Sequence, residues 1–152
     1  MLRVPSTDAD ATYVYQARVR QNPELAGRLG AIANTGNIRH PMITLQGDQD
    51  ALLPIATDSN LYAQMVDAAH RSSQYRYYTV RGGNHVDSQF DDHFGVDTHG
   101  TTVLRPIQPC ARAALAALVT WVEQDTPPPP SHTIPRMATA TADELANDCS
   151  LS

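Results

Sequence analysis

The chain has 152 residues, a formal net charge of −5 and 41% hydrophobic residues, which fits one domain of ordinary size with a core. All eleven basic residues are arginines, and no long basic run marks a nucleic-acid-binding surface. No stretch approaches the roughly 20 apolar residues that span a bilayer, and residues 1–10 lack the apolar core of a signal peptide. We therefore expect no nucleic-acid partner, no membrane partner and no cofactor.

The first part of the chain predicts short helices. Residues 11–29 show a mixed pattern that allows one helical face before a break at Asn22-Pro23. Pro23 suits the first turn of a second short helix over 24–29, because the backbone N–H that proline lacks has no partner there. Glycines at positions 30 and 36 then mark a loop.

Two short segments predict strands. Residues 42–46, Met-Ile-Thr-Leu-Gln, form an apolar run typical of a buried parallel strand. Residues 75–80 are rich in tyrosine, and alternation places Tyr75 and Tyr77 on one face and Tyr78 on the other. A helix is expected over 58–71, between the two strands.

A final helix is expected over 110–124. Its apolar residues Leu115, Leu118, Val119 and Val122 follow the spacing i, i+3, i+4, i+7 and predict the buried face. Four prolines at 127–130 end this helix, and the remainder is expected to be an extended tail.

The order of these elements is typical of the α/β class, with parallel strands and flanking helices. Two strands do not make a stable sheet, so we expect further strands either in residues 1–38 or outside this chain. The two cysteines, Cys110 and Cys149, are too few for a disulfide framework, and two free thiols are expected.

Both predicted strands end in glycine-containing loops that carry an ionisable group. The first loop reads Gly47-Asp48-Gln49-Asp50 and the second Gly82-Gly83-Asn84-His85. Ligands of doubly wound sheets bind beyond the carboxyl ends of the strands, and neighbouring strands lie roughly 4.8 Å apart. A carboxylate that accepts a hydrogen bond from one imidazole nitrogen fixes the tautomer and stabilises the imidazolium formed during proton transfer.

These loops resemble the acid loop and the histidine loop of α/β-hydrolases. The resemblance rests on 45–50 followed by Leu53-Pro54, on 75–80 followed by 82–85, and on the 35 residues between Asp50 and His85. It implies a partial three-layer α/β-hydrolase-like fold, carboxylic ester hydrolysis by a Ser-Asp-His triad, and a small-molecule ester substrate. Residues 104–122 and the prolines are similar to esterases that act on hydroxyalkanoate oligomers or phenolic esters.

The nucleophile of that family is missing from the pattern. Family members place it before the acid, in a G-x-S-x-G turn between a strand and a helix, whereas the only serine before Asp50 is Ser6, which has no flanking glycine. The resemblance therefore implies that the chain carries Asp50 and His85 alone and is inactive by itself. Its parts would be 1–38, the end of a cap or connector; 39–124, the C-terminal half of the hydrolase domain; and 125–152, a proline-rich extended tail.

Several alternatives stay open at this point. The chain could be a non-catalytic remnant that acts as a binding or interaction module. Asp50 alone would also fit a turn, and Asp48 more simply shapes the turn than acts in catalysis. Asp87 could orient His85, although a solvated loop acid is expected. Residues of metal-binding type occur in one loop, for which a solvated loop and no metal are expected: Asp87, Asp91, Asp92, His93, Asp97 and His99.

Overall fold

The computed structural model describes residues 8–87, 104–136 and 149–152. The chain divides into two compact units, Met1–Asn34 and Thr35–Ser152, and each is described by itself. The loop residues Asp91, Asp92, His93, Asp97 and His99, raised above as metal-binding types, lie outside the described residues.

The first unit contains two helices, α1 (Asp8–Gln21) and α2 (Pro23–Ile32). Asn22 separates them and caps α2, because its side-chain oxygen accepts a hydrogen bond from the Leu25 N–H at 3.2 Å. Pro23 begins the helix at a position that needs no backbone donor. The predicted break at Asn22-Pro23 is confirmed, and both helices extend beyond the residues that the pattern indicated.

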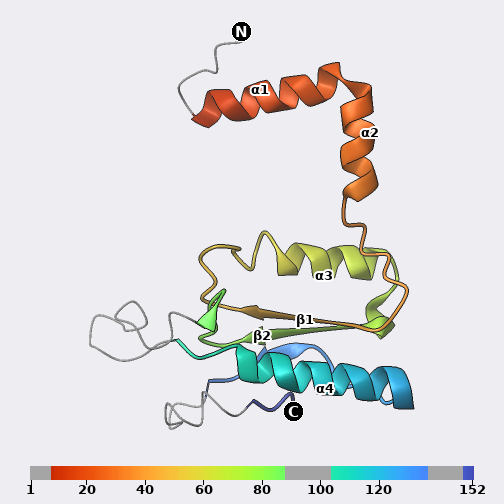
Figure 1. Cartoon of the computed structure of the whole chain (residues 1–152), viewed down its shortest axis with the longest axis vertical. Coiled ribbons are helices and arrows are strands. Elements are labelled where there is room, and N and C mark those ends of the chain that lie inside the picture. Colours follow the sequence, from red (N-terminus) through yellow and green to blue (C-terminus); the bar gives the residue numbers. More distant parts are fainter. Residues whose placement is uncertain (1–7, 88–103, 137–148) are drawn as a thin grey trace, which may run out of the picture. The chain divides into compact units, whose positions relative to one another are not determined.

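The second unit is built on a three-stranded sheet in the order β1-β2-β3 (Figure 1). Strands β1 (Met42–Gly47) and β2 (Tyr75–Val80) are parallel, with a register from Met42 opposite Tyr75 to Gly47 opposite Val80. This parallel pairing confirms the prediction. The third strand, β3 (His132–Ile134), pairs in parallel with the other side of β2. The sequence predicted an extended tail in this segment, and three residues are too few to show a strand periodicity.

Helices cover both faces of this sheet (Figure 1). On one face lies α3 (Ser59–Ala68), whose Tyr62 ring packs edge-on against Tyr75 at a centroid distance of 6.0 Å. The Tyr77 hydroxyl donates to Asn60 of the same helix at 3.0 Å. On the other face lies α4 (Gln108–Gln124). The second unit is therefore of the α/β class, a parallel sheet with flanking helices. A short 3-10 turn, η1 (Ser72–Gln74), precedes β2.

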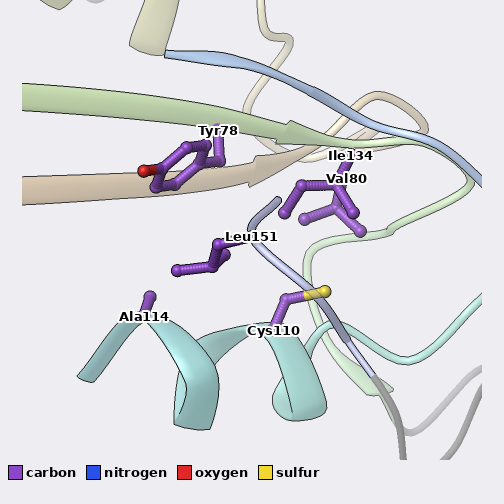
Figure 2. Packing of buried hydrophobic residues seen from close by; sticks show 6 residues of the cluster. All are labelled: Tyr78, Val80, Cys110, Ala114, Ile134 and Leu151. Carbon is purple, nitrogen blue, oxygen red and sulfur yellow. The ribbon is translucent and has the colours of Figure 1, made fainter. Parts of the chain in front are cut away.

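The core lies between the sheet and α4, as Figure 2 shows. Tyr78 and Val80 are fully buried there, on the face opposite to Tyr75 and Tyr77, as strand alternation predicted. The members of this cluster come from β2, β3, α4 and the C-terminal end: Tyr78, Val80, Cys110, Ala114, Ile134 and Leu151.

The face that α4 buries is not the one expected from its apolar spacing. The helix packs through Cys110, Ala114 and Trp121, which are at most 6% exposed. The predicted face is exposed instead, with Leu115 at 63% and Val122 at 61%. The inward face combines small side chains with one tryptophan, so hydrophobic spacing alone does not mark it.

The expectation of two free thiols was wrong, because Cys110 and Cys149 form a disulfide. The bond ties the C-terminal end to α4, and Leu151 packs beside it in the core. The proline run also lies against the sheet, since the Tyr78 hydroxyl donates to the Pro129 carbonyl at 2.6 Å and Arg76 donates to the Pro128 carbonyl at 3.1 Å. In the described parts of the chain, no helix has the length and apolar character to cross a membrane.

Candidate active site

The acid loop and the histidine loop touch through their glycines. A Cβ on Gly47 would lie 2.1 Å from the Gly83 carbonyl oxygen, so neither loop has room for a side chain at this crossing. Two backbone hydrogen bonds join the loops, from Asp48 N–H to the Val80 carbonyl at 3.1 Å and from Gln49 N–H to the Gly83 carbonyl at 2.9 Å. The glycines that follow the two strands thus hold the ends of β1 and β2 together.

This contact brings the two predicted site residues within hydrogen-bond distance. The Nδ1 atom of His85 lies 3.0 Å from Oδ2 of Asp50, although 35 residues separate them in the chain. The hydrogen bond expected from the sequence is therefore present. The Asp50 side chain is 5% exposed and that of His85 is 37% exposed, so a covered carboxylate supports an accessible imidazole.

Several donors surround the Asp50 carboxylate. Oδ1 accepts hydrogen bonds from the N–H groups of Leu52 at 3.0 Å and Leu53 at 2.9 Å. Burial alone would raise the pKa of Asp50, but the hydrogen bonds from Leu53, His85 and Leu52 outweigh it, and the pKa falls below its ordinary value of 3.8. Asp50 is consequently a carboxylate at neutral pH.

Gln46 is a site residue that the sequence reasoning missed. It ends the apolar run of β1, is 5% exposed, and donates through Nε2 to the Leu53 carbonyl. The same nitrogen lies 3.5 Å from Oδ2 of Asp50. Gln46 therefore supports the turn that presents the carboxylate. A glutamine directly before the glycine that ends β1 was the available signal.

Within the described ranges, the imidazole of His85 has a hydrogen-bond partner at one of its two nitrogens. An ionised Asp50 can only accept, so Nδ1 carries the proton of this hydrogen bond. Among the described residues, no hydroxyl or thiol is hydrogen-bonded to Nε2. A neutral imidazole with a free Nε2 lone pair, oriented by a carboxylate, is suited to take a proton from a hydroxyl group.

The two rival acids have structural contacts of their own. Asp48 accepts a hydrogen bond from the Gly82 N–H at 2.7 Å and pairs with Arg81 at 3.3 Å, in keeping with the expected turn role. Asp87, expected to be solvated, instead accepts hydrogen bonds from the N–H groups of Ile107 at 2.6 Å and Gln108 at 2.9 Å. These groups begin α4, so Asp87 ties the histidine loop to that helix.

Apolar side chains flank the Asp50–His85 pair in the sequence and are open to solvent. Leu52 and Leu53 of the acid loop are 69% and 45% exposed, and Val86 is 47% exposed. Among the described residues, no group of three or more His, Cys, Asp or Glu side chains is placed to hold a metal ion.

Comparison with known proteins finds a family model that matches most of the chain. The family model described as 3HB-oligomer hydrolase matches residues 9–150. A curated relative, the D-(-)-3-hydroxybutyrate oligomer hydrolase of Ralstonia nicotianae, is 33% identical over 112 residues, which cover 71% of this chain and 15% of the relative. The chain thus spans about 15% of that relative's length. No solved structure matches the chain.

Proposed function

The chain belongs to the 3HB-oligomer hydrolase family, and we propose that it supplies the acid and the histidine of an ester hydrolase of the α/β-hydrolase type. Asp50 is the orienting acid and His85 the general base and general acid. The nucleophile comes from polypeptide outside this chain, so the chain alone is inactive. The substrate class is a carboxylic ester, and short oligomers of 3-hydroxybutyrate are the first candidates, given the name of the family.

One observation carries the proposal: the Asp50–His85 hydrogen bond at the carboxyl ends of two adjacent parallel strands. Ligands of doubly wound sheets bind at this edge. The family match supports the same reading, since hydrolysis of an oligoester needs a group that activates a nucleophile.

Each nitrogen of His85 has its own role in the proposed reaction. The Nδ1–H group keeps its hydrogen bond to Asp50. Nε2 takes the proton of a serine hydroxyl as the serine oxygen forms a bond to the ester carbonyl carbon. The same proton passes from Nε2 to the departing alcohol when the carbon–oxygen ester bond breaks. A water molecule then loses its proton to Nε2, attacks the acyl group and releases the acid, and the proton returns to the serine.

The surroundings of the pair suit a substrate that is partly apolar. Leu52, Leu53 and Val86 offer exposed alkyl surface in the loops that carry the pair, and a hydroxybutyrate unit presents methyl and methylene groups beside its ester. Burial of one such group contributes about 0.8 kcal/mol to binding.

A chimera tests the proposal. In the Ralstonia nicotianae relative, the matched segment is replaced by the corresponding residues of this chain, and release of 3-hydroxybutyrate from its linear dimer and trimer is measured. The expected result is hydrolysis that falls about 10⁴-fold in Asp50→Asn and by roughly 10⁶-fold in His85→Ala. His40→Ala is the matched control, because this exposed histidine precedes β1 at the opposite end of the strand.

Activity in His85→Ala close to that of the unmodified chimera would overturn the proposal. So would a chimera that folds cooperatively, as judged by circular dichroism and thermal melting, but does not hydrolyse the oligomers. That second result would favour a non-catalytic remnant that acts as a binding or interaction module.

A further inference from the structure

The two ends of the Cys110–Cys149 disulfide differ in their exposure. Cys110 lies in the first turn of α4 and is fully buried, at 0% exposure. Cys149 belongs to the C-terminal segment 149–152 and is only partly buried. A small molecule in solution therefore meets the Cys149 end of the bond first.

An open cavity lies against this end of the bond. Its volume is about 490 Å³, within the roughly 300–1,000 Å³ that small-molecule sites occupy. Three small side chains of α4 line one side of it, and residues 126–129 and 149–152 line the rest. Cys149 is among the described residues that line the cavity and Cys110 is not, so the cavity presents one of the two sulfurs.

A buried cation lies at the other end of the bond. Nη2 of Arg105 is 3.6 Å from Sγ of Cys110, and Arg105 is 5% exposed. Its Nη1 donates to the Pro135 carbonyl at 3.0 Å, which keeps the guanidinium beside the sulfur. An arginine neighbour and a helix N-terminus both favour the thiolate form of a cysteine, and Cys110 has both.

Two further charged groups belong to this environment. Burial and, after it, the charge of Arg136 lower the pKa of Arg105, but a guanidinium stays protonated in proteins. Asp87 accepts hydrogen bonds from the first N–H groups of α4, and its negative charge acts against a thiolate on Cys110. Arg105 is the group in contact with the sulfur, so we expect its effect to prevail.

We propose that the Cys110–Cys149 disulfide is a site of thiol–disulfide exchange, at which a low-molecular-weight thiol attacks Cys149 from the cavity and Cys110 leaves as a thiolate beside Arg105. The incoming thiolate forms a sulfur–sulfur bond to Cys149. The bond between the two cysteines breaks, and its electron pair stays on Sγ of Cys110. The exchange is faster when the leaving thiol has a lower pKa, which is what the guanidinium provides.

A dithiol would complete the reduction. Its second thiolate attacks the reagent sulfur that is bound to Cys149, forms a cyclic disulfide and releases Cys149 as a thiolate. The dithiol is oxidised by two electrons and the protein disulfide is reduced by two. The C-terminal segment, with the buried Leu151, is then no longer tied to α4. This site goes beyond the ester-hydrolase role and does not depend on it.

Mass spectrometry of a trapped adduct tests which sulfur is attacked. The full oxidised chain is mixed briefly with mercaptoethanol without denaturant, and free thiols are then blocked with N-ethylmaleimide. The expected product carries mercaptoethanol on Cys149 and N-ethylmaleimide on Cys110. The reverse placement, equal labelling of the two cysteines, or no adduct in the folded chain would overturn the proposal.

A matched pair of variants tests the cavity as the route of attack. Ala117 lines the cavity, whereas its neighbour Ala116 is exposed on α4. Ala117→Leu places a larger side chain in the cavity and should slow adduct formation at least about tenfold, because exchange depends on access to the sulfur. Ala116→Leu makes the same change on the same helix and should leave the rate unchanged. Equal rates in the two variants would contradict attack through the cavity.

A second pair tests the stabilisation of the leaving group. Arg105→Lys keeps a positive charge near Cys110, and Arg105→Gln removes it. The glutamine variant should form the adduct at least about threefold more slowly than the lysine variant, because the leaving thiol has a higher pKa without a cation beside it. A glutamine variant that exchanges as fast as the lysine variant, or faster, would overturn the role of Arg105.

Discussion

Asp50 is held from two sides, and this determines what His85 can do. One carboxylate oxygen accepts the N–H groups of Leu52 and Leu53, and the other faces Nδ1 of His85. A carboxylate fixed in this way cannot rotate without losing backbone hydrogen bonds. The orientation of the imidazole is therefore set by the acid loop and by the glycine contact between the loops.

The first prediction concerns the tautomer of His85. Because Asp50 is an ionised acceptor, neutral His85 should carry its proton on Nδ1 and leave Nε2 unprotonated. Nitrogen-15 chemical shifts of the imidazole at a pH where the ring is neutral should show this tautomer in the full chain. Asp50→Leu should shift the population toward the Nε2–H form that free histidine prefers. A dominant Nε2–H tautomer in the unmodified chain would contradict the hydrogen-bond assignment.

The second prediction concerns acid. The pKa of Asp50 is lowered in the folded state, so its ionisation adds stability that is fully present above the unfolded value near 3.8 and is lost as the pH falls through the lower folded value. Urea unfolding of Asp50→Asn should show a smaller loss of stability between pH 5 and about pH 3 than unfolding of the unmodified chain. An identical pH dependence would show that the hydrogen bonds to Asp50 do not stabilise its ionised form.

At the residue scale, the sequence was sufficient to predict that Asp50 and His85 lie together, but not which residues support them. The pair could be predicted because each residue follows a glycine at the end of a strand, in loops that resemble a known family. The roles of Gln46 and Asp87 could not, because the groups they bind are backbone atoms. Backbone partners leave no trace in residue identity, and Ile107 lies 20 positions from Asp87.

At the element scale, α4 depends on a cap that comes from another loop. Asp87 accepts the first N–H groups of the helix with both carboxylate oxygens, and an acidic side chain is favourable at a helix N-terminus.

The third prediction follows from this cap. Asp87→Ala should lower the free energy of unfolding by about 0.5–2 kcal/mol, because it leaves helix N–H groups without a partner. Asp87→Asn retains one acceptor oxygen and should lower the free energy of unfolding by less. Chemical denaturation of the three proteins compares these values, and a loss as large in Asn as in Ala would indicate a role other than capping.

The strands and helices of the second unit differ in how far the sequence could predict them. Strand β1 is recognised as a short apolar run between turn residues, and β2 as a tyrosine-rich segment that is followed by two glycines. The prediction of the buried face of α4 was wrong. Hydrophobic spacing marks Leu115, Val119 and Val122, which are exposed, while the face that packs is rich in alanine. Strand β3 was missed because its pairing depends on where the proline run lies against β2.

At the scale of the second unit, the disulfide joins the C-terminal end to α4. Cys110 and Cys149 are 39 residues apart, and the bond holds Leu151 in the core beside α4. The sequence could not reveal this pairing, because it depends on the C-terminal end returning to the first turn of α4.

The fourth prediction is that this bond stabilises the fold. Reduction, or Cys149→Ser, should lower the free energy of unfolding by about 2–4 kcal/mol, since a loop of this length is no longer closed in the unfolded state. Urea unfolding with and without reductant measures the difference. Reductant should have no effect on Cys149→Ser, which serves as the control. Equal stability of the fully reduced and oxidised chains would contradict a structural role.

The central claim is that Asp50 and His85 activate a nucleophile that this chain does not carry. The most direct measurement is labelling with a fluorophosphonate, which reacts with a serine activated by a neighbouring base, followed by mass spectrometry of the labelled peptide. The account predicts no labelling and no ester hydrolysis by the chain alone. In the chimera with the Ralstonia nicotianae relative, it predicts labelling of one serine that the relative contributes, lost in His85→Ala. Labelling of a serine within residues 1–152, or labelling at an unchanged rate without His85, would contradict it.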